Sequence, residues 1–196
     1  MLGLKLPTDP RWVNIVEKNI EEILTDHAYC EQKAATNAIT VIVKHPEYPD
    51  LVKAMTEIVQ EEMAHFSMVH DKILERGLKL GHERRDPYVG DLIAYMGEHH
   101  GGGSKENQLV SRMLVGAMIE ARSCERFRML SEQMEDTDLR DFYRSLMESE
   151  ARHYTTFLGF ARKYGPSIDV DKRWNDFLAF EATLMEKYGK GETMHG

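Results

Sequence analysis

The chain has 196 residues, of which 42% are hydrophobic and 30% are charged, as expected for one globular domain with a sizeable core. The net charge of −8 excludes a protein that coats nucleic acid non-specifically, although it allows a local basic patch. Two cysteines exclude a disulfide framework, and no apolar run approaches the ~18 residues of a membrane span. The first residues lack the features of a signal peptide, so we expect a cytoplasmic protein without a membrane segment.

Five helical segments are predicted by the 3.6-residue period of the apolar residues. The first covers residues 8–44, because Thr8-Asp9-Pro10 offers a helix cap followed by a proline at the first helical position. Its length predicts a bend or break around residues 25–26. The second covers residues 48–76, and Gly77 provides its C-terminal stop.

The remaining helical segments follow a run of three glycines. The third covers residues 104–135, with Ser104 as its cap. A fourth covers residues 138–164 and a shorter fifth covers residues 171–188, followed by a polar tail over residues 189–196. No useful length of the chain alternates as a strand would, so the sequence predicts an all-α protein.

The least regular region lies between the second and third helices, over residues 77–103. It contains a short amphipathic piece and ends in the three glycines. A loop of this length is either functional or disordered, and in a four-helix bundle it carries the long crossover between two helical pairs. We therefore expect a single domain over residues 1–196, with a four-helix bundle, a crossover and an additional C-terminal helix.

One short pattern, Glu-x-x-His, is repeated along the chain. It occurs at Glu62/His65, Glu150/His153 and Glu192/His195. The first two copies lie within the apolar stripes of the second and fourth helices, where residues three apart face the same way. The third copy follows two glycines in the polar tail and has no apolar stripe around it, so we set it aside.

The other two long helices each place one carboxylate in their apolar stripe. Glu31 precedes Glu62 by 31 residues, and Glu120 precedes Glu150 by 30 residues. The two halves of the chain thus repeat one plan, in which a lone glutamate is followed by a turn and then by Glu-x-x-His. Glu125 also lies on the third helix, but its spacing breaks this repeat.

Four carboxylates in one core would repel each other strongly, and two divalent cations would neutralise them. Two imidazoles complete a ligand set that suits iron or manganese, and this pattern is known from ferritin-like dimetal proteins. The alternative is a bundle in which the same residues form partly exposed ion pairs. We predict the metal ligands Glu31, Glu62, His65, Glu120, Glu150 and His153.

One further histidine lies close to this set in the sequence. His27 precedes Glu31 by one helical turn and shares its face. We expect His27 to form a hydrogen bond to a ligand rather than to bind a metal itself.

A ferritin-like dimetal core supports several activities, and the fold does not choose between them. The candidates are hydroxylation with O2, iron oxidation and storage, disproportionation of peroxide by a manganese catalase, and a rubrerythrin-type peroxidase. Two cysteines are too few for the four-cysteine iron site of rubrerythrin-type proteins. A six-ligand set with open positions between the metals favours O2 binding.

Several segments resemble the bacterial tRNA hydroxylases that act on 2-methylthio-isopentenyladenosine. They are LPTDPRW, DHAYCEQKAA, EEMAHF, ERRDPYV, MIEARSCERF and ESEARHY, which together span nearly the whole chain. The resemblance implies a ferritin-like fold and a non-haem di-iron centre built from the six predicted ligands. It also implies that O2 and two electrons from a donor hydroxylate the isopentenyl group of an adenosine in the tRNA anticodon loop. Manganese remains the alternative metal.

A tRNA substrate requires a basic surface on this acidic chain. Arg84, Arg85 and Lys79 cluster in the predicted crossover beside Tyr88, whose ring is of the kind that stacks on a base. Three further arginines follow on the third helix: Arg122, Arg126 and Arg128. We predict that the crossover and one end of the bundle face the tRNA. The alternative is that these arginines form ordinary ion pairs.

Overall fold

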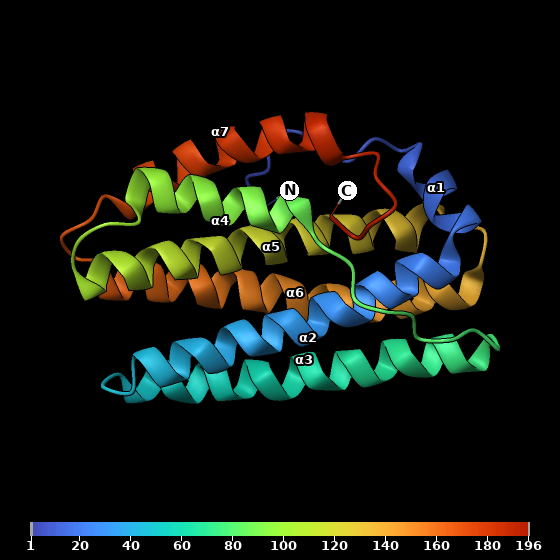
Figure 1. Cartoon of the computed structure of the whole chain (residues 1–196), viewed down its shortest axis with the longest axis horizontal. Coiled ribbons are helices and arrows are strands. Elements are labelled where there is room, and N and C mark those ends of the chain that lie inside the picture. The colour runs from blue at the N-terminus through green and yellow to red at the C-terminus, as the bar shows by residue number, and fades with distance from the viewer. Residues whose placement is uncertain (1, 196) are drawn as a thin grey trace. The chain divides into compact units, whose positions relative to one another are not determined.

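The computed structural model describes residues 2–195, which form α-helices and no strand, so the all-α prediction is confirmed (Figure 1). The helices are α1 (Trp12–Lys18), α2 (Ile20–Lys44), α3 (Pro49–Glu75), α4 (Pro87–His100), α5 (Lys105–Gln133), α6 (Thr137–Tyr164) and α7 (Val170–Tyr188). None of the described helices combines the length and the apolar character that crossing a membrane requires.

Most helix ends lie where the local sequence predicts them. The Ser104 side chain accepts a hydrogen bond from the backbone N–H of Asn107 at the start of α5. Asp136 and Asp169 cap α6 and α7 in the same way, because a short polar side chain satisfies the first N–H groups of a helix. Gly77 follows α3 with a φ of 66°, a conformation that favours glycine.

The predicted break in the first helical segment lies at Asn19 and not at residues 25–26. Asn19 has φ −133° and ψ 37°, which are not helical, and it separates α1 from α2. Thr25 and Asp26 stay helical and buried because each forms a tertiary hydrogen bond. The Thr25 hydroxyl accepts from the N–H of Gly81 at 3.2 Å, and the Asp26 carboxylate accepts from the N–H of Met194 at 2.7 Å.

The segment predicted to be an irregular crossover, residues 77–103, contains the 14-residue helix α4, which the sequence did not predict. Asp86 caps this helix, and proline occupies its first turn. Tyr88, Leu92 and Met96 are buried at intervals of four residues, so α4 is an amphipathic helix that covers part of the core.

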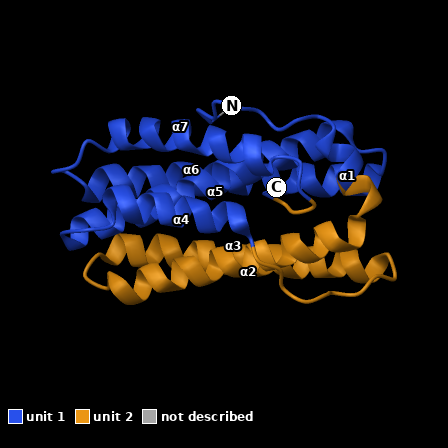
Figure 2. Ribbon diagram, turned by 45° about the horizontal axis from the view of Figure 1, so that its top comes forward, with its two compact units in different colours: residues 1–15, 86–191, 195–196 blue, residues 16–85, 192–194 orange. Residues whose placement is uncertain are grey.

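The structure divides into two compact units (Figure 2). Unit 1 comprises Met1–Ile15, Asp86–Gly191 and His195–Gly196, and unit 2 comprises Val16–Arg85 and Glu192–Met194. Unit 1 contains α4, α5, α6 and α7, and unit 2 contains the α2–α3 hairpin. The single domain expected from the sequence therefore stays a prediction.

Helix α5 is the most deeply buried helix of unit 1. Nineteen of its 29 residues are buried, and α6, α4 and α7 all contact it. In α3, by contrast, seven of 27 residues are buried. Gly116 allows the close approach of α6, because a Cβ atom there would lie 3.1–3.2 Å from ring atoms of Phe157. A larger residue at this position would therefore push the two helices apart.

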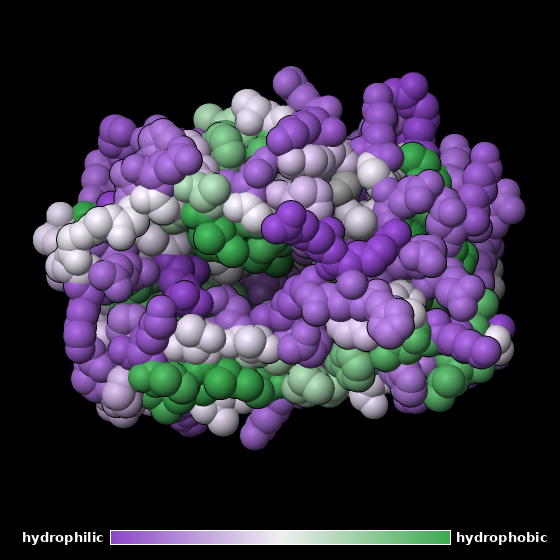
Figure 3. Space-filling view, viewed as in Figure 1, coloured by the Kyte–Doolittle hydropathy of each residue, from purple (hydrophilic) through white to green (hydrophobic). Residues whose placement is uncertain are grey.

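The α2–α3 hairpin also exposes apolar side chains. Apolar residues gather over this hairpin in the surface view of Figure 3. The exposed residues Ile39 and Val43 lie one turn apart on α2, and Val43 is 72% exposed. Helix α2 therefore presents an apolar stripe to solvent in addition to the one that it buries.

Candidate metal centre

Unit 2 brings three of the predicted ligands together. Glu31 on α2 and Glu62 and His65 on α3 are all buried, and we call them the α2–α3 trio. His65 Nδ1 lies 3.7 Å from Glu31 Oε2 and 3.5 Å from Glu62 Oε2. Each residue offers a ligand atom within 4.8 Å of those of the other two. Two carboxylates and one imidazole thus converge in the way that a metal ion requires.

Unit 1 repeats this arrangement with the other three predicted ligands. Glu120 on α5 and Glu150 and His153 on α6 are buried, and we call them the α5–α6 trio. His153 Nδ1 lies 3.9 Å from Glu120 Oε2, and the three residues again offer ligand atoms within 4.8 Å of one another. The repeat in the sequence is therefore a repeat in space, with one trio in each unit.

The α2–α3 trio is electrostatically unfavourable without a cation. Burial and then the negative charge of Glu62 raise the pKa of Glu31 to about 8, although the neighbouring His65 opposes this rise. A carboxylate with such a pKa holds its proton at neutral pH unless another positive charge replaces it. The donor set and its charge therefore fit a divalent metal ion.

The metal-free protein is expected to lose stability as the pH rises from about 5 to about 8. Over this range folded Glu31 keeps its proton, whereas the unfolded chain releases it, because the ordinary pKa is 4.5. The folded state binds more protons, so the free energy of unfolding falls by at most ~1.4 kcal/mol per pH unit. Urea unfolding in the presence of a chelator measures this slope. Glu31→Gln should flatten it, and an equal slope in that variant would contradict the assignment.

His27 forms the hydrogen bond that the sequence predicts. Its Nε2 lies 2.6 Å from Glu31 Oε1, and both side chains are buried.

Glu125, whose spacing breaks the repeat, forms hydrogen bonds outside the α5–α6 trio. Its carboxylate accepts from the hydroxyl of Thr8 at 2.6 Å and from Arg122 at 3.0 Å, both within unit 1.

Comparison with known proteins identifies the family. A model of the family described as tRNA-(MS[2]IO[6]A)-hydroxylase (MiaE) matches residues 2–196. The chain belongs to this family. A curated relative from Pseudomonas putida, named tRNA 2-(methylsulfanyl)-N(6)-isopentenyladenosine(37) hydroxylase, is 36% identical over 93% of this chain and 86% of its own. A Salmonella typhimurium relative with the same name is 27% identical over 93% of this chain and 83% of its own.

A solved structure supports the fold of this MiaE family member. The protein titled "Protein 43 with aldehyde deformylating oxygenase activity from Synechococcus" aligns with a TM-score of 0.89 and 30% identity. The match covers 98% of this chain and 95% of that one. The all-α, ferritin-like fold class predicted from the sequence is therefore confirmed.

Two of the arginines predicted to face tRNA lie in the interior of this MiaE family member, so that prediction is wrong for them. Arg122 is 0% exposed and donates to Glu181 at 2.8 Å, to Glu125 at 3.0 Å and to the carbonyl oxygen of Leu6 at 2.9 Å. The guanidinium of Arg126, also 0% exposed, lies 3.8 Å from the centre of the Trp12 ring.

The side chain of Arg128 stays partly exposed and lies 3.8 Å from Glu132 on the same helix. Burial and then the positive charge of the neighbouring Arg122 together lower the pKa of Arg126 to about 9. The alternative, in which these arginines form ion pairs, therefore holds for Arg122. Arg126 instead packs on Trp12, and the exposed Arg128 does not decide between the two alternatives.

The predicted substrate-binding residues have different environments. Tyr88 is 0% exposed and its hydroxyl donates to Glu181 at 3.0 Å, so the prediction that its ring stacks on a base is wrong for this structure. Arg84 pairs with Glu22 at 3.2 Å. Arg85 is exposed at the end of the same segment. Of the three, the exposed Arg85 is the best placed to meet a phosphate.

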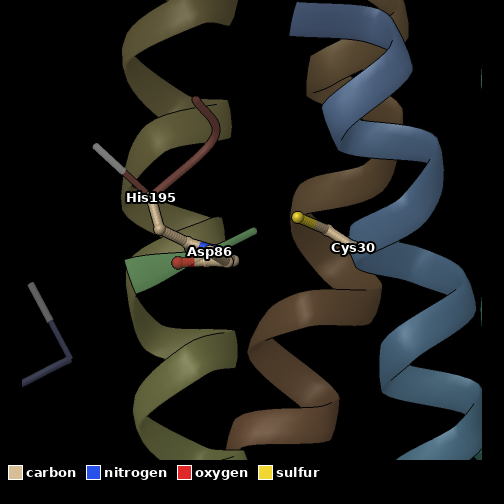
Figure 4. A group of neighbouring side chains, drawn as sticks. All are labelled: Cys30, Asp86 and His195. Carbon is tan, nitrogen blue, oxygen red and sulfur yellow. The ribbon is translucent and has the colours of Figure 1, made fainter. Parts of the chain in front are cut away.

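The predicted polar tail is buried at its end, which the sequence did not indicate. Met194 and His195 are 1% and 2% exposed. His195 Nδ1 lies 2.8 Å from Asp86 Oδ2, as Figure 4 shows for this pair, and its Nε2 lies 3.3 Å from the Ser123 hydroxyl. The third Glu-x-x-His copy is therefore no helical ligand pair, because the described tail is not helical. Its histidine is nonetheless part of the core of unit 1.

Proposed function

We propose that this chain hydroxylates the isopentenyl side chain of 2-methylthio-isopentenyladenosine in tRNA, using O2 and two electrons at two iron ions held by the α2–α3 and α5–α6 trios. Membership of the MiaE family and the names of two curated relatives support the reaction. The observation that carries the metal assignment is the duplicated, buried trio of two glutamates and one histidine. An external donor supplies the electrons, and we expect the reaction to take place in the cytoplasm.

The charge of the two trios supports two divalent ions. Each trio contributes two carboxylates and one imidazole, so one divalent cation per trio balances the negative charge. Carboxylate oxygens and imidazole nitrogens suit iron, with manganese as the alternative. When bound, reduced iron supplies the activation of O2 for attack on a C–H bond.

The residues of the trios have three tasks in this proposal. The four glutamates and two histidines hold the metals, and their burial keeps bulk water from the reacting group. His27 holds the carboxylate of Glu31 in place. We also propose that residues 1–196 form a single domain, as the sequence predicts.

Metal analysis followed by nucleoside mass spectrometry tests the proposal. We expect about two irons per chain, and a tRNA nucleoside heavier by one oxygen atom after the reduced protein meets O2. The substrate is tRNA from cells that lack the hydroxylated nucleoside. Accumulation of many irons per chain would indicate an iron store, and O2 release from peroxide by a manganese form would indicate a catalase. Either result without nucleoside oxidation would contradict the proposal.

A second candidate activity follows from the structural comparison. The Synechococcus protein is titled as having aldehyde deformylating oxygenase activity, and it is 30% identical to this chain. The same reduced protein should therefore be incubated with an aliphatic aldehyde in parallel. Turnover of the aldehyde in place of the tRNA nucleoside would favour this second activity.

We propose that Arg85, with Arg84 beside it, contacts the tRNA backbone. Arg85→Ala is expected to weaken tRNA binding and to lower the salt slope of the binding constant by about one ion, as for the loss of a phosphate contact. Arg84→Ala should change the slope less, because Arg84 already pairs with Glu22. Fluorescence anisotropy with labelled tRNA at several salt concentrations measures both quantities. Lys53→Ala, which removes an exposed charge on α3, is the control. An unchanged slope in Arg85→Ala would exclude the contact.

A further inference from the structure

The two trios match residue for residue, but the residues one turn before their lone glutamates differ. His27 precedes Glu31 by four residues on α2, whereas Gly116 precedes Glu120 by four residues on α5. Residues four apart on a helix are neighbours on one face. The lone glutamate of unit 2 therefore has an imidazole beside it that the equivalent position in unit 1 does not provide.

The imidazole of His27 engages one particular oxygen of Glu31. His27 Nε2 lies 2.6 Å from Glu31 Oε1, while Oε2 of the same carboxylate lies 3.7 Å from His65 Nδ1. One carboxylate oxygen is therefore held by the histidine, and the other is directed towards the α2–α3 trio. A short hydrogen bond to a carboxylate fixes its rotation and tunes its strength as a ligand.

In unit 1 the ring of Phe157 occupies the space beside Gly116, the position equivalent to His27. A Cβ atom on Gly116 would lie 3.1–3.2 Å from three ring carbons of Phe157, so a histidine side chain would displace that ring. Phe157 is buried and follows His153 by one turn on α6. The difference between the two positions is therefore built into the packing of the helices.

We propose that His27 is a positioning residue that makes the two metal positions unequal. It holds Glu31 as a ligand through one oxygen and thereby strengthens metal binding at the α2–α3 trio, whereas the equivalent position beside Glu120 is Gly116, which offers no imidazole. This inference rests on the proposed metal binding. It goes beyond that proposal by assigning one of the two ions a tighter or more ordered position that depends on a residue outside the ligand set.

Metal titration of His27→Ala tests the inference without measuring turnover. Metal-free protein is titrated with Co²⁺ or Mn²⁺ in competition with a chelator, and circular dichroism checks that the helices are retained. We expect one of the two binding steps to weaken ~10–100-fold, as for the loss of a hydrogen bond to a metal ligand, and the other to stay unchanged. The visible spectrum of bound Co²⁺ should change for the weakened step alone.

Two further variants separate positioning from general packing. In His27→Gln the amide NH2 can donate to Glu31 in place of the imidazole, so most of the lost affinity should return. His45→Ala removes another buried histidine of unit 2, at the C-terminal end of α2, and should leave both steps unchanged. Equal weakening of both steps, or native affinity in His27→Ala, would overturn the inference. Failure of the native protein to bind metal would instead overturn the proposed function.

Discussion

Glu62→Ala is expected to abolish tRNA hydroxylation and to reduce tight metal binding from about two ions per chain to at most one. Glu62 is 1% exposed, and its Oε2 lies 3.5 Å from His65 Nδ1 within the α2–α3 trio. Its removal takes away a charged metal ligand. We expect the loss of several kcal/mol of transition-state stabilisation by the metal, which lowers the rate at least ~10³-fold. Nucleoside mass spectrometry and metal analysis of the purified variant measure the two effects.

The stability of the same variant distinguishes a metal ligand from a structural carboxylate. Metal should raise the melting temperature of the native protein, because it binds the folded state, and should raise that of Glu62→Ala much less. Without metal, the variant should be affected little, since losing one of two neighbouring buried carboxylates relieves repulsion and offsets part of the lost packing. Glu57→Ala, at an exposed position of the same helix, is the matched control. Full activity in Glu62→Ala would exclude the proposed centre.

Arg122→Met is expected to destabilise the protein by ~3–5 kcal/mol, the typical effect of removing one partner of a buried ion pair. Arg122 is fully buried and neutralises both Glu181 and Glu125. Its loss leaves these carboxylates in an environment of low polarity without a compensating charge. Urea unfolding at neutral pH measures the change in the free energy of unfolding.

A second substitution tests the physical reason for this loss. Arg122→Met combined with Glu181→Leu should recover much of the stability, because a buried ion pair replaced by apolar residues is often neutral or stabilising. Arg128→Ala removes a partly exposed arginine of the same helix and should change stability by less than about 0.5 kcal/mol. A loss below about 1 kcal/mol in Arg122→Met would show that water or a rearrangement satisfies the two carboxylates.

The trios could be predicted from the sequence because each of their residues interrupts the apolar stripe of its own helix, and such an interruption is visible within a few residues. A glutamate or histidine within an apolar stripe, such as Glu62 or His153, is visible against the 3.6-residue period. The same holds for the helix ends at Ser104 and Gly77, where short-range backbone chemistry decides the boundary. The lone glutamates precede the Glu-x-x-His pairs by nearly equal distances, 31 and 30 residues, in the two halves of the chain. This repeat identified Glu31 and Glu120, which the Glu-x-x-His motif alone does not contain.

The buried polar network could not be predicted in this way, because its partners are far apart in the sequence. Arg122 and Glu181 are 59 residues apart, and each by itself resembles a surface residue of a helix. Tyr88 and His195 depend on the same interior of unit 1, so the expectation of an exposed ring and a polar tail was wrong for the same reason. Polar residues that satisfy one another at long range leave no periodic pattern.

The heavy burial of α5 bears on how this chain can change over evolutionary time. Three neighbouring helices pack against α5, so a larger side chain would clash with packed atoms at most of its positions. Most positions of α3 lie outside the core and can accept replacements with little effect on folding. We therefore expect amino-acid substitutions to accumulate on the outer face of the α2–α3 hairpin during evolution, and to be rare on α5.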